Sequence, residues 1–192
     1  MRYSLLQLFA FTVIFCATSI YPPKVHAQKF DDPIIRDTAN AFYRQLSNII
    51  RQIDSHFDKA KDSLVDTTGQ KTWSCKENFK IDGARSCAIY QRGFNTMYVA
   101  FFLSRESKDA LEPSYHNLCH QLRDCMGPNY VYKEKKATTA DMLLGSKDYK
   151  CEMIPSRDAV PDQADMLVSV EKDTQTGNYE LVLEIQKYRG YY

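Results

Sequence analysis

The sequence has no excess of charge of either sign, since 25 Lys and Arg stand against 24 Asp and Glu in 192 residues. This balance removes the usual electrostatic argument for nucleic acid or an anionic membrane surface as a binding partner. Hydrophobic residues make up 44% and charged residues 26% of the chain, as in globular proteins rather than disordered, collagen-like or coiled-coil chains. The length then suits a single folded domain.

Motifs for catalysis and cofactor binding are also missing. There is no Gly-x-Ser-x-Gly turn that would present a serine nucleophile, and the scattered acidic residues single out no catalytic pair. The sequence shows no internal repeat, no low-complexity tract and no Asn-x-Ser/Thr glycosylation site. These absences predict no cofactor and favour binding over catalysis.

The first 27 residues have the pattern of an export signal. Arg2 supplies a positive start, and the segment from Leu5 to Ile20 is largely apolar. The segment ends in Val25-His26-Ala27, which places side chains acceptable to signal peptidase three positions and one position before a cut. We therefore predict cleavage between Ala27 and Gln28.

Two alternatives to a cleaved signal remain open. An uncleaved anchor is disfavoured because the apolar run is shorter than the roughly 20 residues that a spanning helix needs. Lipidation of Cys16 is disfavoured because the preceding Phe15 is bulky. No later segment is long and apolar enough to span a membrane, so we expect an exported protein, periplasmic or extracellular, with a slightly acidic mature chain 28–192.

The mature chain is expected to begin with a long amphipathic helix. Asp32-Pro33 has the pattern of a helix start, and apolar residues then recur every three or four positions, which predicts a helix from about 33 to 65. The stripe consists of Ile35, Ala39, Phe42, Leu46, Ile49, Ile53, Phe57, Ala60 and Leu64. Such a stripe can pack on a sheet, or it can pair with a second chain to form a homodimer.

The rest of the chain is rich in strand patterns. We expect strands at about 71–79, 85–92, 97–104, 130–136, 149–154, 165–172 and 179–188, with a short second helix that starts at Glu112 and ends before Gly127-Pro128. The strand at 97–104 is apolar on both faces, which predicts a central strand covered on both sides. The sequence thus predicts an α+β fold, in which two helices pack on a mostly antiparallel sheet of about five to seven strands.

Five cysteines remain after signal removal, and exported proteins usually pair theirs. Cys75 and Cys87 lie symmetrically about a predicted turn at Ile81, so they can face each other across a hairpin. Cys151 is expected to bond to Cys119 or Cys125, and the sequence leaves this choice open. The cysteine that stays single is either buried and inert or able to join two chains.

One helix segment carries residues that could support chemistry. His116 and His120 are four residues apart on the second predicted helix, so both can face one side and hold a metal, with Cys119 or Cys125 as a further ligand. Asn117 stands where a metalloprotease has Glu. The same pattern arises from two solvent-exposed histidines beside a disulfide cysteine, so His116 and His120 are only weak metal candidates.

The segment from Tyr130 to Lys136 contains both tyrosines and lysines, with Glu134 among the lysines. Single-strand nucleic-acid binders interleave aromatic and basic residues in this way, but a lysine-rich edge strand has the same pattern and agrees better with the charge balance. Taken together, the sequence favours an exported, disulfide-containing domain that binds a protein partner, an inhibitor target or an envelope component. The alternatives are a small secreted hydrolase or metal-dependent enzyme using His116 and His120, and an envelope structural protein that dimerises through the N-terminal helix.

Overall fold

The computed structural model describes residues 41–67, 69–136, 149–156 and 164–188, which all belong to one compact unit, Asp32–Tyr192. The predicted signal, its cleavage site at Ala27 and Gln28, and the predicted helix start at Asp32-Pro33 lie outside the described residues. The elements are α1 (Ala41–Ile50), β1 (Lys61–Asp66), β2 (Lys71–Cys75), η1 (Glu77–Phe79), β3 (Ser86–Arg92), β4 (Asn95–Arg105), α2 (Glu112–Met126), η2 (Gly127–Asn129), β5 (Tyr130–Lys136), β6 (Tyr149–Pro155), β7 (Ala164–Lys172) and β8 (Tyr179–Lys187).

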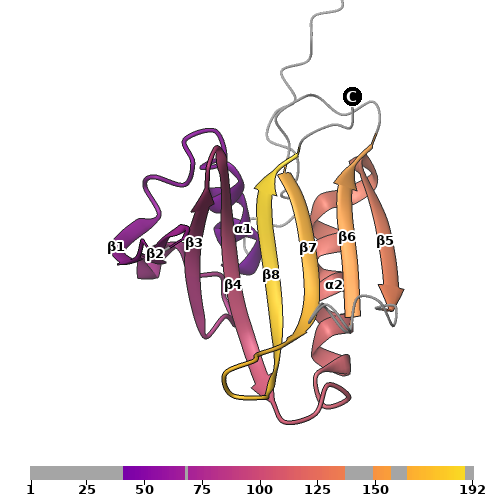
Figure 1. The fold of residues 1–192 in the computed structure, drawn as a ribbon. Coiled ribbons are helices and arrows are strands. Elements are labelled where there is room, and N and C mark those ends of the chain that lie inside the picture. Colours follow the sequence, from indigo (N-terminus) through magenta and orange to yellow (C-terminus); the bar gives the residue numbers. More distant parts are fainter. Residues whose placement is uncertain (1–40, 68, 137–148, 157–163, 189–192) are drawn as a thin grey trace, which may run out of the picture. The chain divides into compact units, whose positions relative to one another are not determined.

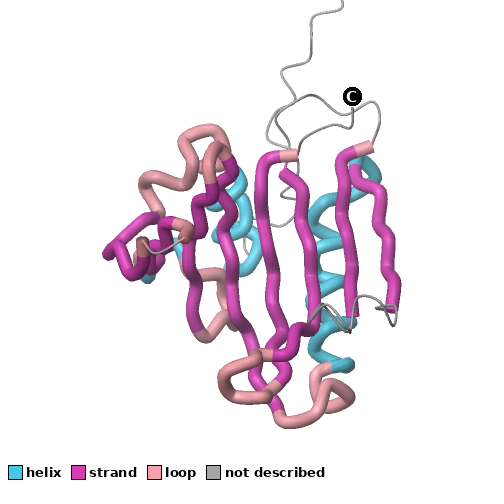
Figure 2. Tube along the Cα trace, in the orientation of Figure 1, coloured by secondary structure: helices cyan, strands magenta, loops and turns pink. Residues whose placement is uncertain are grey.

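The eight strands form one antiparallel sheet in the order β1-β2-β3-β4-β8-β7-β6-β5. Both helices lie on the same side of this sheet, the side turned away from the viewer in Figure 1. Figure 2 shows the two helices behind the strands in the same orientation. The predicted α+β class is therefore confirmed, with eight strands in place of the expected five to seven.

The prediction of a long first helix is wrong. α1 has 10 residues and ends at Ile50, and the chain continues through turns in which His56 and Phe57 adopt φ values of +53° and +57°. Ile53 and Phe57 are nevertheless buried, whereas Leu64 lies on β1 and is 52% exposed. A spacing of three or four residues can direct side chains into a core from consecutive turns as well as from a helix, which explains the error.

The fold consists of two halves with the same order of elements. Each half has a helix followed by four consecutive antiparallel strands, α1 with β1–β4 and α2 with β5–β8. The last strands of the halves, β4 and β8, pair with each other at the centre of the sheet, where Ala100 lies opposite Leu183. α2 carries the chain from this centre to the far edge at β5, so the topology contains a repeat that the sequence does not reveal.

The core lies between the helices and the sheet. Inward positions of β6, β7 and β8 alternate with outward ones, so every second residue of these strands is buried against the helices. α1 contributes Phe42, Leu46 and Ile49 to this core. The central buried side chains also include Ile89, Tyr98, Tyr115, Leu118, Leu122, Met153, Met166, Val168, Leu181, Leu183 and Ile185.

Both edges of the sheet are protected against pairing with another sheet. The predicted strand Tyr130–Lys136 is β5, which forms one edge as its lysine-rich pattern suggested, with Lys133 exposed. At the other edge, β1 is short and its register with β2 shifts on both sides of Leu64. Charged residues and irregular register are common ways to prevent edge-to-edge association.

Candidate functional site

The predicted metal ligands are not brought together. His116 and His120 are exposed on α2, whereas Cys119 is buried at 1% exposure. The His116 ring contacts two carboxylates, with Nδ1 3.2 Å from Glu134 Oε1 and Nε2 3.7 Å from Glu112 Oε1. Within the ranges that the structure describes, no group of three or more His, Cys, Asp or Glu residues is placed to hold a metal ion.

Five cysteines lie in the part of the chain that the structure describes, where none is bonded to another, and they fall into two close pairs and one separate residue. Cys75 lies near Cys87, and Cys119 lies near Cys151, although neither pair is at the distance of a disulfide bond. Cys125 is buried elsewhere on α2, near Tyr43 of α1.

The side of the sheet opposite the helices is the most extensive candidate site. Among the described residues, no helix or strand covers it (Figure 1). We call this surface the open face and define it by the outward-pointing side chains of the five strands from β3 to β6. These residues are Ala88, Tyr90, Met97, Val99, Phe101, Glu180, Val182, Glu184, Gln186, Asp165, Leu167, Ser169, Glu171, Lys150, Glu152 and Ile154.

The centre of the open face is apolar and closely packed. Val182 lies between Phe101 on β4 and Ser169 on β7, and it is only 2% exposed. Val99 on β4 is 4% exposed. The prediction that β4 is a central strand is confirmed, because it is fourth of the eight strands, and Val99 is buried on its outward side as Tyr98 and Ala100 are on its inward side.

The apolar centre is accompanied by carboxylates. The outward positions of β7 and β8 hold Asp165, Glu171, Glu180 and Glu184, and none of these positions holds Lys or Arg. Glu171 lies directly opposite Glu180, an arrangement of like charges that disfavours folding. Arg85 offsets part of this repulsion, because its Nη2 lies 2.7 Å from Glu180 Oε1.

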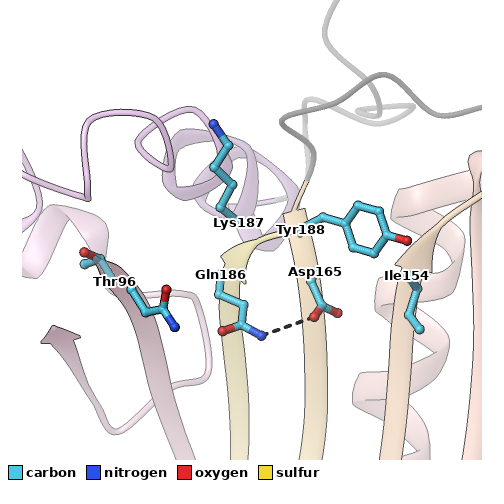
Figure 3. A pocket seen from close by; sticks show the side chains of 7 residues that line it. Thr96, Ile154, Asp165, Gln186, Lys187 and Tyr188 are labelled. Atoms are coloured by element: carbon cyan, nitrogen blue, oxygen red, sulfur yellow. Dashed lines mark hydrogen bonds between the residues drawn. The ribbon is translucent and has the colours of Figure 1, made fainter. Parts of the chain in front are cut away.

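A hollow of about 270 Å³ opens where β8 ends and β7 begins. Its lining comes from four strands and the residue after β8, namely Asn95, Thr96, Ile154, Asp165, Gln186, Lys187 and Tyr188. Gln186 Nε2 donates a hydrogen bond to Asp165 Oδ2 at 3.2 Å (Figure 3). The Tyr188 ring extends toward Ile154, whereas the Lys187 amine points away from Asp165 and pairs with Asp54 at 3.1 Å.

The side chains that line this hollow suit the binding of a polar group of a ligand rather than a covalent reaction. Burial raises the pKa of Asp165, and the hydrogen bond from Gln186 opposes this shift. Sequence reasoning missed one further contact, between Thr96 Oγ1 and His56 Nδ1 at 3.3 Å, because the two residues are 40 positions apart. Among the described residues His56 has no carboxylate to orient it, so the pair lacks the third group of a nucleophilic triad.

A large apolar side chain is displayed beside this hollow. Phe94 is 91% exposed in the two-residue turn between β3 and β4. The preceding Gly93 has φ of +59°, as the first position of a type II′ hairpin turn requires. Phe94 therefore stands at the same end of the sheet as Asn95 and Thr96, which line the hollow.

No described helix is long and apolar enough to cross a membrane. Comparison of the chain with protein-family models, with curated proteins and with solved structures gives no match.

Proposed function

We propose that this chain is an exported binding domain that recognises a protein partner through the open face of its sheet. The observation that carries the proposal is that Met97, Phe101 and Leu167 are partly exposed on the side away from the helices, around the buried Val99 and Val182. An antiparallel sheet that merely faces water usually alternates apolar residues inside with polar residues outside. Apolar residues on the solvent side, bordered by polar ones, are typical of interaction surfaces.

The carboxylates indicate the chemistry of the partner. The four carboxylates at the outward positions of β7 and β8, where no Lys or Arg stands, favour a surface that carries Lys or Arg beside apolar side chains. Glu171 opposite Glu180 places two like charges side by side on this face, which adds to its acidic character. We therefore expect binding to weaken as ionic strength rises.

The open face is somewhat smaller than one side of a standard protein–protein interface. Five strands about 4.8 Å apart and about seven residues long, at about 3.4 Å per residue, give a surface of roughly 600 Å². A standard protein–protein interface buries about 800 Å² on each partner. Phe94, which is 91% exposed at one end of the sheet, adds an anchor of the aromatic type that often dominates binding energy.

The two other predicted functions have less support. An enzyme that uses His116 and His120 would need a buried or metal-holding arrangement, and both histidines are exposed. Dimerisation through the first helix would need a free apolar stripe, and Phe42, Leu46 and Ile49 of α1 are buried in the core.

The proposal is tested by affinity capture from the exported fraction of the producing cells, with the purified mature protein as bait. Glu171→Lys places a positive charge opposite Glu180, so this variant should keep or raise Tm while it weakens partner binding at least tenfold, about 1.4 kcal/mol. Phe94→Ser should keep the fold, because the side chain is 91% exposed, and should weaken binding as well.

Asp124→Lys is the matched control, since Asp124 is exposed in the last turn of α2, where a positive charge suits the helix dipole. It should capture the same partner as the unchanged protein. Equal capture of the partner by the unchanged protein and all three variants would contradict the proposal. Loss of the partner in Asp124→Lys alone would also contradict it, as would the absence of any partner captured in stoichiometric amount.

A further inference from the structure

Cys75 and Cys87 are brought face to face by the sheet. β2 and β3 pair antiparallel with Ser74 opposite Ala88, and the same register carried on by one residue sets Cys75 opposite Cys87. Both side chains are partly buried on the helix side of the sheet. The two thiols also share a hydrogen bond, which raises the pKa of Cys75 and lowers the pKa of Cys87.

Cys119 and Cys151 meet in the other half of the fold. Cys119 belongs to the buried side of α2, and Cys151 points inward from β6, with exposures of 1% and 0%. A hydrogen bond between these thiols raises the pKa of Cys119 and lowers the pKa of Cys151. A lowered pKa raises the fraction of thiolate, the form that attacks a disulfide.

Cys125 belongs to neither pair. It lies six residues beyond Cys119 on α2, a rise of roughly 9 Å along the helix, and it has Tyr43 of α1 as a hydrogen-bonding neighbour. Its side chain is 2% exposed, and burial raises its pKa to about 12. The thiol is therefore protonated and shielded, which also keeps it from linking two folded chains.

We propose that the folded chain carries two disulfides, Cys75–Cys87 and Cys119–Cys151, with Cys125 as a permanently reduced thiol. Each half of the fold then holds one covalent link, between β2 and β3 in the first half and between α2 and β6 in the second. Each bond forms by exchange with a disulfide donor. Before folding buries the thiols, one thiolate attacks the donor, which forms a mixed disulfide and releases one donor thiol. The second thiolate then attacks the protein sulfur of that mixed disulfide and releases the other donor thiol, so the donor takes up the two electrons and two protons. The proposed export determines only which disulfide donor the protein meets in its natural setting. In solution, oxidised glutathione carries out the same exchange, so the pairing can be tested independently of export.

Peptide mapping tests this pairing sharply, because trypsin places the five cysteines on five different peptides. The peptides are 72–76, 86–92, 109–123, 124–133 and 151–157, and cleavage after Arg123 separates Cys119 from Cys125. The reduced, full mature chain is equilibrated with reduced and oxidised glutathione, alkylated under denaturing conditions and digested without reductant. Mass spectrometry should find peptide 72–76 joined to 86–92, peptide 109–123 joined to 151–157, and a single alkylated cysteine in peptide 124–133.

Five alkylated cysteines, or any disulfide that contains Cys125, would overturn the proposal. Two variants sharpen the result. Cys125→Ala should form both links at the yield of the unchanged protein. Cys119→Ala should leave Cys151 alkylated, because its partner is gone. If this variant instead formed a Cys125–Cys151 disulfide at the yield of the original Cys119–Cys151 disulfide, Cys125 would not be spatially separate from Cys151 as proposed.

Discussion

Tyr98 offers a quantitative test of the packing between the sheet and the segment that joins β2 to β3. Its side chain is fully buried, and its hydroxyl donates a hydrogen bond to the Phe79 carbonyl at 2.9 Å. The same oxygen accepts a hydrogen bond from the Ile81 amide. Tyr98→Phe keeps the ring but leaves a carbonyl and an amide without their partner, which should cost about 2 kcal/mol.

For a domain of this size, that loss corresponds to a Tm lower by about 4–8 °C. Thermal unfolding followed by circular dichroism measures the shift, with Tyr179→Phe as the matched control. Tyr179 is only partly buried and its ring lies 5.8 Å from the Lys172 amine, so removing its hydroxyl should change the free energy of unfolding by less than about 0.5 kcal/mol. Equal Tm values for the Tyr98→Phe variant and the unchanged protein would refute the hydrogen-bonding scheme.

Three further predictions concern titration and backbone conformation. Burial raises the pKa of Asp165, so the folded state holds this proton more tightly than the unfolded chain, and the carboxyl costs stability as pH rises through its titration range. The Tm of Asp165→Asn minus that of the unchanged protein should therefore grow between pH 3 and pH 6, and a constant difference would count against a desolvated carboxyl. Burial likewise raises the pKa of Tyr98 and Tyr115, so these phenols ionise only in the unfolded state, and urea midpoints should fall as pH passes about 10. Unchanged midpoints at pH 11 would contradict their burial. Gly93→Ala places a Cβ on a residue with φ of +59° and should lower the free energy of unfolding by about 1 kcal/mol. Gly69→Ala should leave it unchanged, because Gly69 has no positive φ and no atom lies within 4 Å of the added Cβ. Chemical denaturation of both variants measures this difference.

Most elements could be predicted because their patterns are local. The alternation in 165–172 and 179–188 corresponds closely to β7 and β8, and the Gly127-Pro128 stop ends α2 at Met126. The first helix could not be predicted in length, because a three-to-four spacing does not distinguish helix from consecutive turns that face the same core. The positive φ values of His56 and Phe57 have no signal in the sequence.

The candidate site depended on long-range pairing and could not be read from the sequence. The two apolar sides of β4 predicted a central strand, but only the pairing of β4 with β8 places Phe101 beside Val182. Spacing alone suggested Cys75 with Cys87. The choice between Cys119 and Cys125 depends on which of them approaches β6, which the helical pattern does not specify.

Carboxyl footprinting tests most directly whether the open face is the binding surface. The captured complex and the free protein are labelled with carbodiimide and glycine amide, and each carboxylate is quantified by mass spectrometry. We predict that Glu171 and Glu184 on the sheet lose labelling in the complex, while Glu112 and Asp124 on α2 are labelled equally in both. Protection of the α2 carboxylates with unchanged labelling of the sheet carboxylates would contradict the account.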